Sequence, residues 1–302
     1  MKVVIAGGTG LIGSALASTL QDRGHQVGII SRDPAGVKPE YQALSWDERA
    51  LVKELGKADA VINLAGASLA GNNPFQMRWT PKRKAAILSS RLVVGEKLVE
   101  AIKELDQPPE VFVQASAIGY YGNQGDQPAD EKAPSGDDFL AEICRAWEQS
   151  TVEVEEMGLR RLVIRIGLVL SQKGGLLPLL ALPFRFFAGG VMGSGDQYLS
   201  WIHIQDIVES ILYLINDPKH QGVYNLTAPQ PATNREFAHH LGQTLRKPVW
   251  LPVPAVVLKA ALGEASTLAL DGLPVYPSRL LNTGYQFAFP DLKDSLEDLF
   301  SR

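Results

Sequence analysis

The sequence predicts an α/β fold, a doubly wound parallel sheet with a smaller C-terminal substrate lobe. Three observations lead to this prediction. The first half of the chain alternates short β-branched runs with longer amphipathic stretches. The β-branched runs are continuously apolar, which is typical of parallel strands that helices cover on both faces. A glycine-rich run, GGTGLIG at residues 7–13, directly follows the first of them.

The elements of the first lobe are expected in alternation. The helix predicted over 11–23 shows the reasoning, since its apolar residues recur at helical spacing and Gly24 offers a stop. The strands are predicted at 3–6, 26–31, 58–65, 110–115, 159–166 and 222–226. The other helices are predicted at 81–105, 137–157 and 206–215.

The second half of the chain is organised differently. Residues 171–199 are rich in Gly, Pro and Leu, and the apolar run at 174–191 is interpreted as a buried segment. Further helices are predicted near 234–245, 255–262 and 291–300. We therefore expect a nucleotide-binding domain from 1–170 plus 200–228, and a substrate lobe from 171–199 plus 229–302.

Composition excludes several classes of protein. A chain of 302 residues that is 45% hydrophobic, with a net charge of −4, is neither disordered nor basic enough for nucleic acid. The single cysteine, Cys144, excludes a disulfide framework, and the histidines form no metal-binding pattern. No run reaches the roughly 18–20 apolar residues of a membrane span, and no targeting signal stands at the N-terminus. We expect a cytoplasmic protein with no membrane partner.

The glycine-rich run has a specific chemical use. Gly7, Gly10 and Gly13 form a G-x-x-G-x-x-G pattern between a predicted strand and a predicted helix. Such a turn lets a pyrophosphate approach the backbone, where free N–H groups and the positive end of the helix dipole attract it. The pattern alone is weak evidence, but its place in a strand–turn–helix unit predicts a Rossmann-type dinucleotide-binding domain.

The end of the second predicted strand indicates which dinucleotide binds. NAD sites usually carry an Asp or Glu there, which accepts hydrogen bonds from the ribose hydroxyls. This chain has Ser31 and Arg32 instead, and a guanidinium suits a 2′-phosphate, so we predict NADP(H). Two alternatives stay open. If the end of the strand were shifted by one residue, Asp33 would lie near the ribose. Alternatively, Arg32 could be a solvated loop cation.

Several motifs together resemble a known family. They are GGTGLIG, DAVINLAG at 59–66, QASAIGYYG at 114–122, RIGLVL at 165–170 and WIHIQDI at 201–207. Their order is similar to that of extended short-chain dehydrogenases and sugar-nucleotide epimerases. The finer resemblance, over essentially the whole chain, is to an atypical branch labelled "epimerase family" or cell-division-inhibitor-like, with a C-terminal domain of unknown function.

The resemblance implies a set of cofactor-binding residues. The pyrophosphate would lie on Gly7, Thr9, Gly10, Leu11, Ile12 and Gly13. Ser31 and Arg32 would hold the 2′-phosphate end. The adenine and its ribose would lie against Leu64, Ala65 and Gly66. Arg91 would reach the cofactor from the next helix, unless it forms a surface ion pair, and Val169 would sit beside the nicotinamide.

The family's usual acid–base pair is missing. The resemblance implies a Tyr-x-x-x-Lys helix near 137–147, but this chain has Leu140 and Cys144 at those places. Ser116, which would polarise the substrate oxygen, is present. Tyr120 and Tyr121 are candidate proton donors, and a tyrosine of ordinary pKa, near 10, is a better acid than base at neutral pH. Cys144 is a further candidate, as a nucleophile. The alternatives are that both tyrosines pack structurally and that Cys144 is inert.

Four residues of the predicted substrate lobe are candidates for substrate contact: Arg185, Gln197, Trp201 and His203. Arg185 interrupts an apolar run, so it meets an anionic group, pairs with a buried acid or caps a helix. The alternative for His203 is a structural hydrogen bond. Asp206 is expected to cap the following helix, with Glu209 as its capping-box partner.

The leading functional hypothesis is an NADP(H)-dependent oxidoreductase that reduces a small carbonyl-type substrate, with Ser116 and Tyr120 or Tyr121 at the reacting oxygen. A second hypothesis is a non-catalytic, NADP(H)-dependent regulator or scaffold with a protein partner or a homo-oligomeric state. A third is a nucleotide-sugar epimerase with a rearranged acid–base pair.

Overall fold

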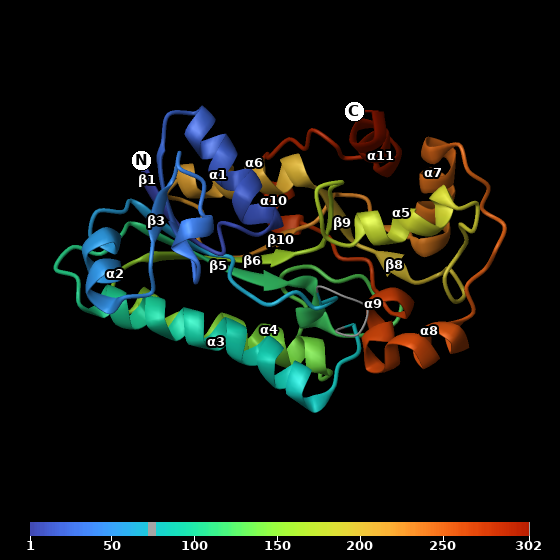
Figure 1. Cartoon of the computed structure of the whole chain (residues 1–302), viewed down its shortest axis with the longest axis horizontal. Coiled ribbons are helices and arrows are strands. Elements are labelled where there is room, and N and C mark those ends of the chain that lie inside the picture. The colour runs from blue at the N-terminus through green and yellow to red at the C-terminus, as the bar shows by residue number, and fades with distance from the viewer. Residues whose placement is uncertain (72–76, 302) are drawn as a thin grey trace.

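The computed structural model describes residues 1–71 and 77–301. Seven parallel strands form the central sheet, in the order β3-β2-β1-β4-β5-β6-β10. Their bounds are Lys2–Ala6 (β1), Gln26–Ile30 (β2), Gln42–Leu44 (β3), Ala60–Asn63 (β4), Val111–Ala117 (β5), Arg160–Ile166 (β6) and Gly222–Leu226 (β10). The predicted doubly wound α/β fold is therefore confirmed (Figure 1).

Helices cover both faces of this sheet. On one face lie α1 (Leu11–Asp22) and α6 (Ile204–Asn216), and on the other α2 (Glu48–Leu55), α3 (Pro81–Lys103) and α4 (Phe139–Gln149) (Figure 1). This cover explains the continuously apolar strands. The chain order reverses at β1, which lies between β2 and β4. Open α/β sheets bind ligands at the carboxyl ends of the strands beside such a reversal.

Some elements of the first lobe escaped the sequence analysis. The edge strand β3 has only three residues, and α2 follows it after a short loop. The helix predicted over 137–157 ends at Gln149 and is followed by the separate 3₁₀ turn η4 (Val152–Glu155). Short edge elements leave little periodic signal, which is why the pattern missed them.

The C-terminal lobe is built mainly from helices around a second core. Its elements are α5 (Leu177–Arg185), α7 (Asn234–Leu245), α8 (Ala255–Leu262), η5 (Gly263–Ser266), α9 (Thr267–Leu270), α10 (Ser278–Asn282) and α11 (Leu292–Ser301). Two small sheets pair β7 (Leu168–Leu170) with β9 (Trp201–His203), and β8 (Tyr198–Leu199) with β11 (Ala232–Thr233). Leu177, Phe184, Phe237, Leu241 and Leu296 form much of this core. The division of the chain at 170, 200 and 228 stays a prediction.

The helix cap of α6 is His203 and not Asp206, which the sequence had suggested. His203 is the N-cap of α6, and its Nδ1 accepts a hydrogen bond from the Gln205 N–H at 3.1 Å. The Asp206 carboxylate instead accepts hydrogen bonds from the backbone N–H groups of Ala288 (2.7 Å) and Phe289 (2.9 Å). The capping-box prediction was therefore wrong, because burial of Asp206 against the C-terminal segment supplies better donors than the helix end.

The run at 174–191 is only partly buried, which corrects a second interpretation. Leu177 and Phe184 are buried, whereas Leu179, Leu182 and Phe186 are exposed. Within the described ranges, no helix is both long and apolar enough to cross a bilayer.

Candidate functional site

The glycine-rich turn joins β1 to α1 in a conformation that requires glycine. Gly7 has a φ of +83°, and a Cβ there would lie 2.8 Å from the carbonyl carbon of Leu64. A Cβ on Gly13 would lie 2.3 Å from the Gly7 carbonyl oxygen, so α1 packs directly on the turn. The turn is closed by a hydrogen bond from the Gly10 N–H to the Gly7 oxygen at 3.0 Å. The backbone therefore has the close, side-chain-free shape that a pyrophosphate needs.

The first turn of α1 is prepared for an anion. Gly10 is its N-cap and supplies no side-chain hydrogen bond, and no acidic residue stands in the first turn. Thr9 and Gly10 are exposed, and Leu11 and Ile12 are half-buried. Free N–H groups at a helix start attract phosphate, so the residues present fit the phosphates of a dinucleotide.

Ser31 and Arg32 follow β2 at the carboxyl edge of the sheet. The Ser31 hydroxyl donates to the Asp33 carbonyl oxygen at 2.9 Å and accepts from the Asp33 N–H at 3.1 Å, so it orders the loop. Arg32 is exposed, and no described residue forms a hydrogen bond or ion pair with its guanidinium. Its charge is therefore available for a phosphate.

Arg91 on α3 is a buried cation rather than a member of a surface ion pair. Its side chain is 7% exposed, and its Nη1 donates to the carbonyl oxygens of Ile87 (2.9 Å) and Ala67 (3.2 Å). Within the described chain it has no carboxylate partner, and its Nε has no hydrogen-bond partner. Burial lowers the pKa of Arg91 to about 10. An unneutralised buried guanidinium favours an anionic ligand.

Gly66 gives Arg91 room beside the sheet. A Cβ on Gly66 would lie 3.0 Å from the Arg91 Cζ. Leu64 and Ala65, which precede Gly66 after β4, are partly buried, and the Ala65 N–H donates to the Asn63 side chain at 3.2 Å. The structure thus brings the 64–66 segment, Arg91 and the glycine-rich turn together at one edge of the sheet. Val169 is half-buried on β7, and its place beside the nicotinamide stays a prediction.

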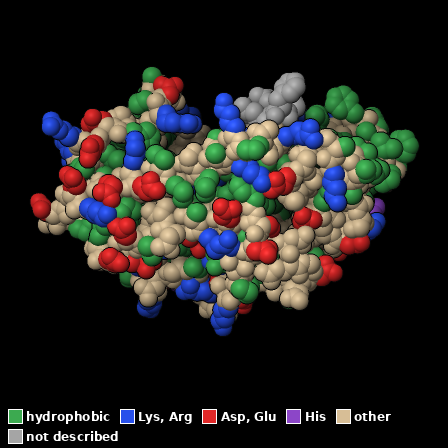
Figure 2. Space-filling view, turned by 90° about the horizontal axis from the view of Figure 1, so that it is seen from below, with side chains coloured by type: hydrophobic (Ala, Val, Ile, Leu, Met, Phe, Trp, Pro, Cys, Tyr) green, Lys and Arg blue, Asp and Glu red, His purple; other side chains and the backbone are tan. Residues whose placement is uncertain are grey.

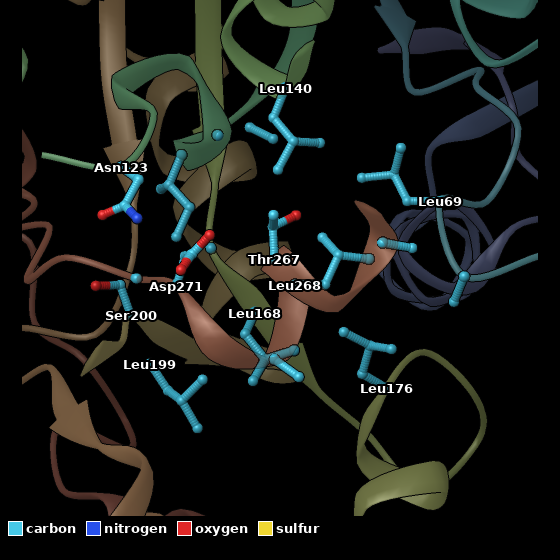
Figure 3. A pocket seen from close by; sticks show the side chains of 18 of the residues that line it. Leu69, Asn123, Leu140, Leu168, Leu176, Leu199, Ser200, Thr267, Leu268 and Asp271 are labelled. Atoms are coloured by element: carbon cyan, nitrogen blue, oxygen red, sulfur yellow. The ribbon is translucent and has the colours of Figure 1, made fainter. Parts of the chain in front are cut away.

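A cavity of about 530 Å³ opens beyond the ends of β5 and β6, between the sheet and the C-terminal lobe. Ala117 and Ile166 end these strands and form part of its wall. Most of the remaining wall is apolar, with the leucines Leu69, Leu140, Leu168, Leu176, Leu179, Leu180, Leu199, Leu258, Leu262, Leu268 and Leu273. Those labelled in Figure 3 surround the cavity: Leu69, Leu140, Leu168, Leu176, Leu199 and Leu268. Arg91 reaches the same cavity from α3. The cavity therefore adjoins the cofactor site and suits an apolar molecule.

A small polar group interrupts this apolar wall. Asp271, Asn123 and Thr267 lie near one another in Figure 3, with leucines around them. Burial and the nearby Asp138 carboxylate raise the pKa of Asp271, while Lys259 and a hydrogen bond from Asn123 act in the opposite direction. The Thr267 hydroxyl is buried and has no hydrogen-bond partner in the described part of the chain. A carboxyl group with a raised pKa in a cavity is a candidate acid–base group.

The helix α4 presents the residues that replace the missing acid–base pair. Asp138 caps this helix by accepting a hydrogen bond from the Ala141 N–H at 2.9 Å. Leu140 and Cys144 both line the cavity, which is where the resemblance placed the tyrosine and the lysine. Burial raises the pKa of the Cys144 thiol to about 11. A thiol with that pKa is protonated at neutral pH, which favours the inert alternative.

Ser116 and Tyr121 belong to a buried polar network. The Ser116 hydroxyl donates to Glu148 at 2.7 Å, and Glu148 forms two hydrogen bonds with Arg165 at 2.9 and 3.0 Å. Arg165 donates to the Tyr121 hydroxyl at 3.1 Å, which in turn donates to Asn225 at 2.7 Å. Burial raises the pKa of Tyr121 to about 12. These groups already satisfy one another, so the network holds β5, β6 and β10 together.

Tyr120 lies next to this network but does not join it by its hydroxyl. The Arg165 guanidinium stacks 3.3 Å from the centroid of the Tyr120 ring. Ser116, Tyr120 and Tyr121 are not among the described residues that line the cavity. The geometry thus favours the structural alternative for Tyr121, which is fully buried. It gives no support to Tyr120 as a proton donor or to Ser116 as the group that polarises the substrate oxygen.

The residues predicted to contact substrate also have other partners. Gln197 donates to the carbonyl oxygens of Met192 (3.0 Å) and Ala269 (2.8 Å), and the Trp201 indole donates to that of Gln230 (3.1 Å). The buried His203 caps α6, and its Nε2 lies 3.5 Å from a carboxylate oxygen of Asp298. Arg185 is exposed at the end of α5. Of the described cavity-lining residues, none is one of these four.

Asp271, Asn123 and Thr267 were not among the site residues predicted from the sequence. Asn123 follows the IGYYG segment at the end of β5, whereas the other two lie in the C-terminal lobe. No local motif joins them, because only the fold brings them together. Groups of three or more His, Cys, Asp or Glu that could hold a metal ion are absent from the residues described.

Comparison with known proteins agrees with this architecture. The model of the NAD dependent epimerase/dehydratase family matches residues 3–227, and that of a domain of unknown function, DUF1731, matches residues 253–299. The epimerase family protein SDR39U1 of Mus musculus is 37% identical over 301 residues, which cover 99% of each chain. The epimerase family protein YfhF of Bacillus subtilis is 36% identical and covers 100% of this chain and 98% of its own.

Solved structures show the same relationship. The human epimerase family protein SDR39U1, crystallised with NADPH, superposes with a TM-score of 0.88 at 35% identity, over 100% of this chain and 99% of the human one. The UDP-N-acetylglucosamine 4-epimerase of Bacillus cereus has a TM-score of 0.76 at 16% identity, which shows a shared fold only. With its glycine-rich turn, its unpaired cations and these relatives, the chain belongs to the NAD-dependent epimerase/dehydratase family, as an atypical nicotinamide-cofactor-binding short-chain dehydrogenase/reductase.

Proposed function

We propose that this protein is an NADP(H)-dependent reductase that acts on an apolar carbonyl compound. The observation that carries the proposal is the apolar cavity of about 530 Å³ that adjoins the cofactor site at the ends of β5 and β6. NADPH, when bound, supplies a hydride. The chain's own residues bind the two molecules, exclude water from the cavity and provide a proton.

The exposed guanidinium of Arg32 supports NADP(H) rather than NAD(H). An arginine that meets a 2′-phosphate forms charge-assisted hydrogen bonds that contribute roughly 1.5–3 kcal/mol, about ten- to a hundredfold in affinity. Arg91 supplies a second, buried positive charge, which suits the cofactor's phosphates from the α3 side. The NADPH in the human relative's structure is consistent with this assignment.

A fluorescence titration with NADPH and NADH tests the cofactor. Arg32→Ala should weaken NADPH binding about ten- to a hundredfold and leave NADH binding nearly unchanged. Arg49→Ala removes an exposed arginine from α2 and serves as the matched control. Equal affinities of the wild type for the two cofactors would overturn the NADP(H) assignment.

Asp271 is the group we assign as proton donor. Its carboxyl stands in the cavity beside Asn123, and its raised pKa keeps a larger fraction protonated than an exposed aspartate would have. Hydride transfer to the carbonyl carbon breaks the C=O π bond, and the oxygen takes the Asp271 proton to give an alcohol. The carboxylate then regains a proton from water. Asn123 positions the Asp271 carboxyl group by its hydrogen bond. The Thr267 hydroxyl can donate a hydrogen bond to the substrate oxygen.

Turnover measurements test this step. We expect decanal and related apolar aldehydes to oxidise NADPH, with a rate that falls as the pH rises through the pKa of Asp271. Asp271→Asn should lower turnover about 10²- to 10⁴-fold while NADPH affinity is unchanged. Asp126→Asn makes the same change in an exposed loop and should have no effect. Full turnover by Asp271→Asn would exclude Asp271 as the acid, and no turnover of any apolar aldehyde would exclude the substrate class.

The other two functions are weaker candidates, each with its own test. A nucleotide sugar would need polar partners for its hydroxyls, whereas the cavity wall is mostly leucine. One observation favours a regulator: Leu140 and Cys144 occupy the positions of the acid–base pair in the cavity wall. A regulator would show NADPH-dependent binding of a protein partner in pull-downs, together with no turnover.

A further inference from the structure

The C-terminal lobe exposes an unusual amount of apolar surface. Eight of the twelve large apolar side chains exposed in the described part of the chain belong to one set, which we call the apolar rim: Leu179, Leu182, Phe186, Phe187, Trp250, Leu251, Val256 and Val257. Phe186 is 75% exposed and Val256 is 70% exposed. Figure 2 shows hydrophobic side chains gathered at the end of the molecule that carries this lobe. Contiguous patches of this kind mark interaction surfaces.

Hydrogen bonds to backbone carbonyl oxygens join the two parts of the apolar rim, residues 179–187 and residues 250–257. The Trp250 indole donates to the Phe187 carbonyl oxygen at 2.8 Å, and the Val253 N–H donates to the Val191 oxygen at 2.8 Å. The second part continues into α8, whose sequence AVVLKAAL is apolar except for one lysine. This helix has no buried side chain. A helix that is apolar nearly all round is normally covered, and the described part of the chain leaves α8 without full cover.

The charge of this surface indicates the partner. Residues 173–193 and 242–263, which carry the apolar rim, contain no Asp or Glu, although the whole chain has a net charge of −4. Their cations are Lys173, Arg185, Arg246, Lys247 and Lys259; Lys173 precedes Gly174, which lies near Leu11 of α1, and Lys259 also acts on Asp271. The Lys247 ammonium lies 3.6 Å from the centroid of the Phe187 ring, so cation and aromatic group stand together. Apolar side chains mixed with cations, without acids, suit the headgroup region of an anionic bilayer.

The apolar rim also borders the cavity. Leu179 of α5 and Leu258 and Ala261 of α8 line the cavity, while Leu182, Val256 and Val257 on the same two helices face solvent. A surface that contacted these helices would therefore lie beside the cavity.

We propose that the apolar rim docks the protein on the surface of an anionic lipid bilayer, so that a substrate dissolved in the lipid reaches the cavity directly. A second copy of the chain fits this surface less well, since a two-fold interface would bring two identical surfaces together that both carry cations and no acids to pair with them. This proposal replaces the earlier expectation of no membrane partner. That expectation rested on the lack of a membrane-spanning run, which concerns crossing a bilayer and not binding to its surface. Docking goes beyond the proposed reductase activity and is tested without it, whereas delivery of a substrate to the cavity rests on that activity.

Vesicle flotation with the full chain tests the proposal. The probes are vesicles of phosphatidylcholine alone and vesicles with about one third phosphatidylserine. We expect binding to the anionic vesicles only, with a blue shift of tryptophan emission from the exposed Trp250. Phe186→Ser with Val256→Ser should abolish binding, and Val93→Ser on the exposed side of α3 is the matched control.

Charge-reversal variants measure how much the cations contribute to vesicle binding, apart from the apolar side chains. Arg185→Glu with Lys247→Glu should weaken vesicle binding by at least about fivefold for each cation, whereas Lys53→Glu on α2 should not. Melting temperatures check that each variant is folded. Flotation with neither vesicle, or equal flotation with both, would overturn the proposal. So would a molar mass of two copies that falls to one in the Phe186→Ser and Val256→Ser variant, because the occupant would then be a second chain.

Discussion

At the scale of single residues, the hydrogen-bond partners of a polar side chain show whether its role is structural or catalytic. Tyr121 is fully buried and exchanges hydrogen bonds with Arg165 and Asn225, so its hydroxyl is occupied. Asp271 is only partly buried and faces the cavity with a raised pKa. Residue type alone would rank the tyrosine first as a proton donor. The surroundings reverse that order, because a group whose partners are all protein atoms has none left for a substrate.

Tyr121→Phe therefore tests a structural role. We expect it to lower the free energy of unfolding by about 1–3 kcal/mol, since the buried Asn225 oxygen loses its donor. Urea unfolding at neutral pH measures the change. Tyr120→Phe is the matched control, because no described residue hydrogen-bonds its hydroxyl and the Arg165 stacking survives. Loss of turnover in Tyr121→Phe without loss of stability would restore Tyr121 as a catalytic candidate.

At the scale of elements, the β1–turn–α1 unit shows how close packing makes a binding site. The helix starts on the turn itself, with the Ser14 N–H bonded to the Gly10 oxygen at 2.8 Å. Gly13 lies in the first turn of α1 and touches the Gly7 carbonyl. This contact keeps the helix start beside the strand end, so that its N–H groups point at the phosphate site.

Gly13→Ala should break this unit. Its Cβ would meet the Gly7 oxygen at 2.3 Å and the Gly8 Cα at 2.7 Å, so strand and helix must separate. We expect NADPH affinity to fall by at least about tenfold, the loss of one charge-assisted hydrogen bond. Isothermal titration checks this, with circular dichroism to confirm folding. Ser18→Ala, at an exposed position later in α1, should bind NADPH like the wild type.

At the scale of the whole molecule, a few charged groups tie the outer elements to the sheet. Glu54 on α2 meets Lys2 of β1 at 2.5 Å, Lys57 at 2.9 Å and Gln42 of β3 at 2.9 Å. The hydrogen bonds from Lys2, Lys57 and Gln42 lower the pKa of Glu54 to about 2. This cluster anchors the edge strand that the sequence did not reveal.

Acid should weaken the fold through Glu54. Its folded pKa of about 2 lies below the ordinary value of 4.5, so its contribution to stability is complete above pH 4.5 and is lost as the pH falls toward 2. Urea unfolding across this range should show a smaller acid loss in Glu54→Gln than in the wild type. Glu96→Gln, an exposed change on α3, should follow the wild type. Identical pH profiles for wild type and Glu54→Gln would contradict the assignment.

The sequence by itself determined the fold of the cofactor half of this protein. Continuous apolar strands, helical periodicity and the spacing of Gly7, Gly10 and Gly13 are local features, and local sterics and hydrogen bonding enforce them. The tertiary structure alone decided the cavity. Asn123, Asp138 and Asp271 lie far apart in the chain, and only packing of the C-terminal lobe on the sheet brings them together. The pKa changes of these groups depend on such long-range contacts, which leave no local signal in the sequence.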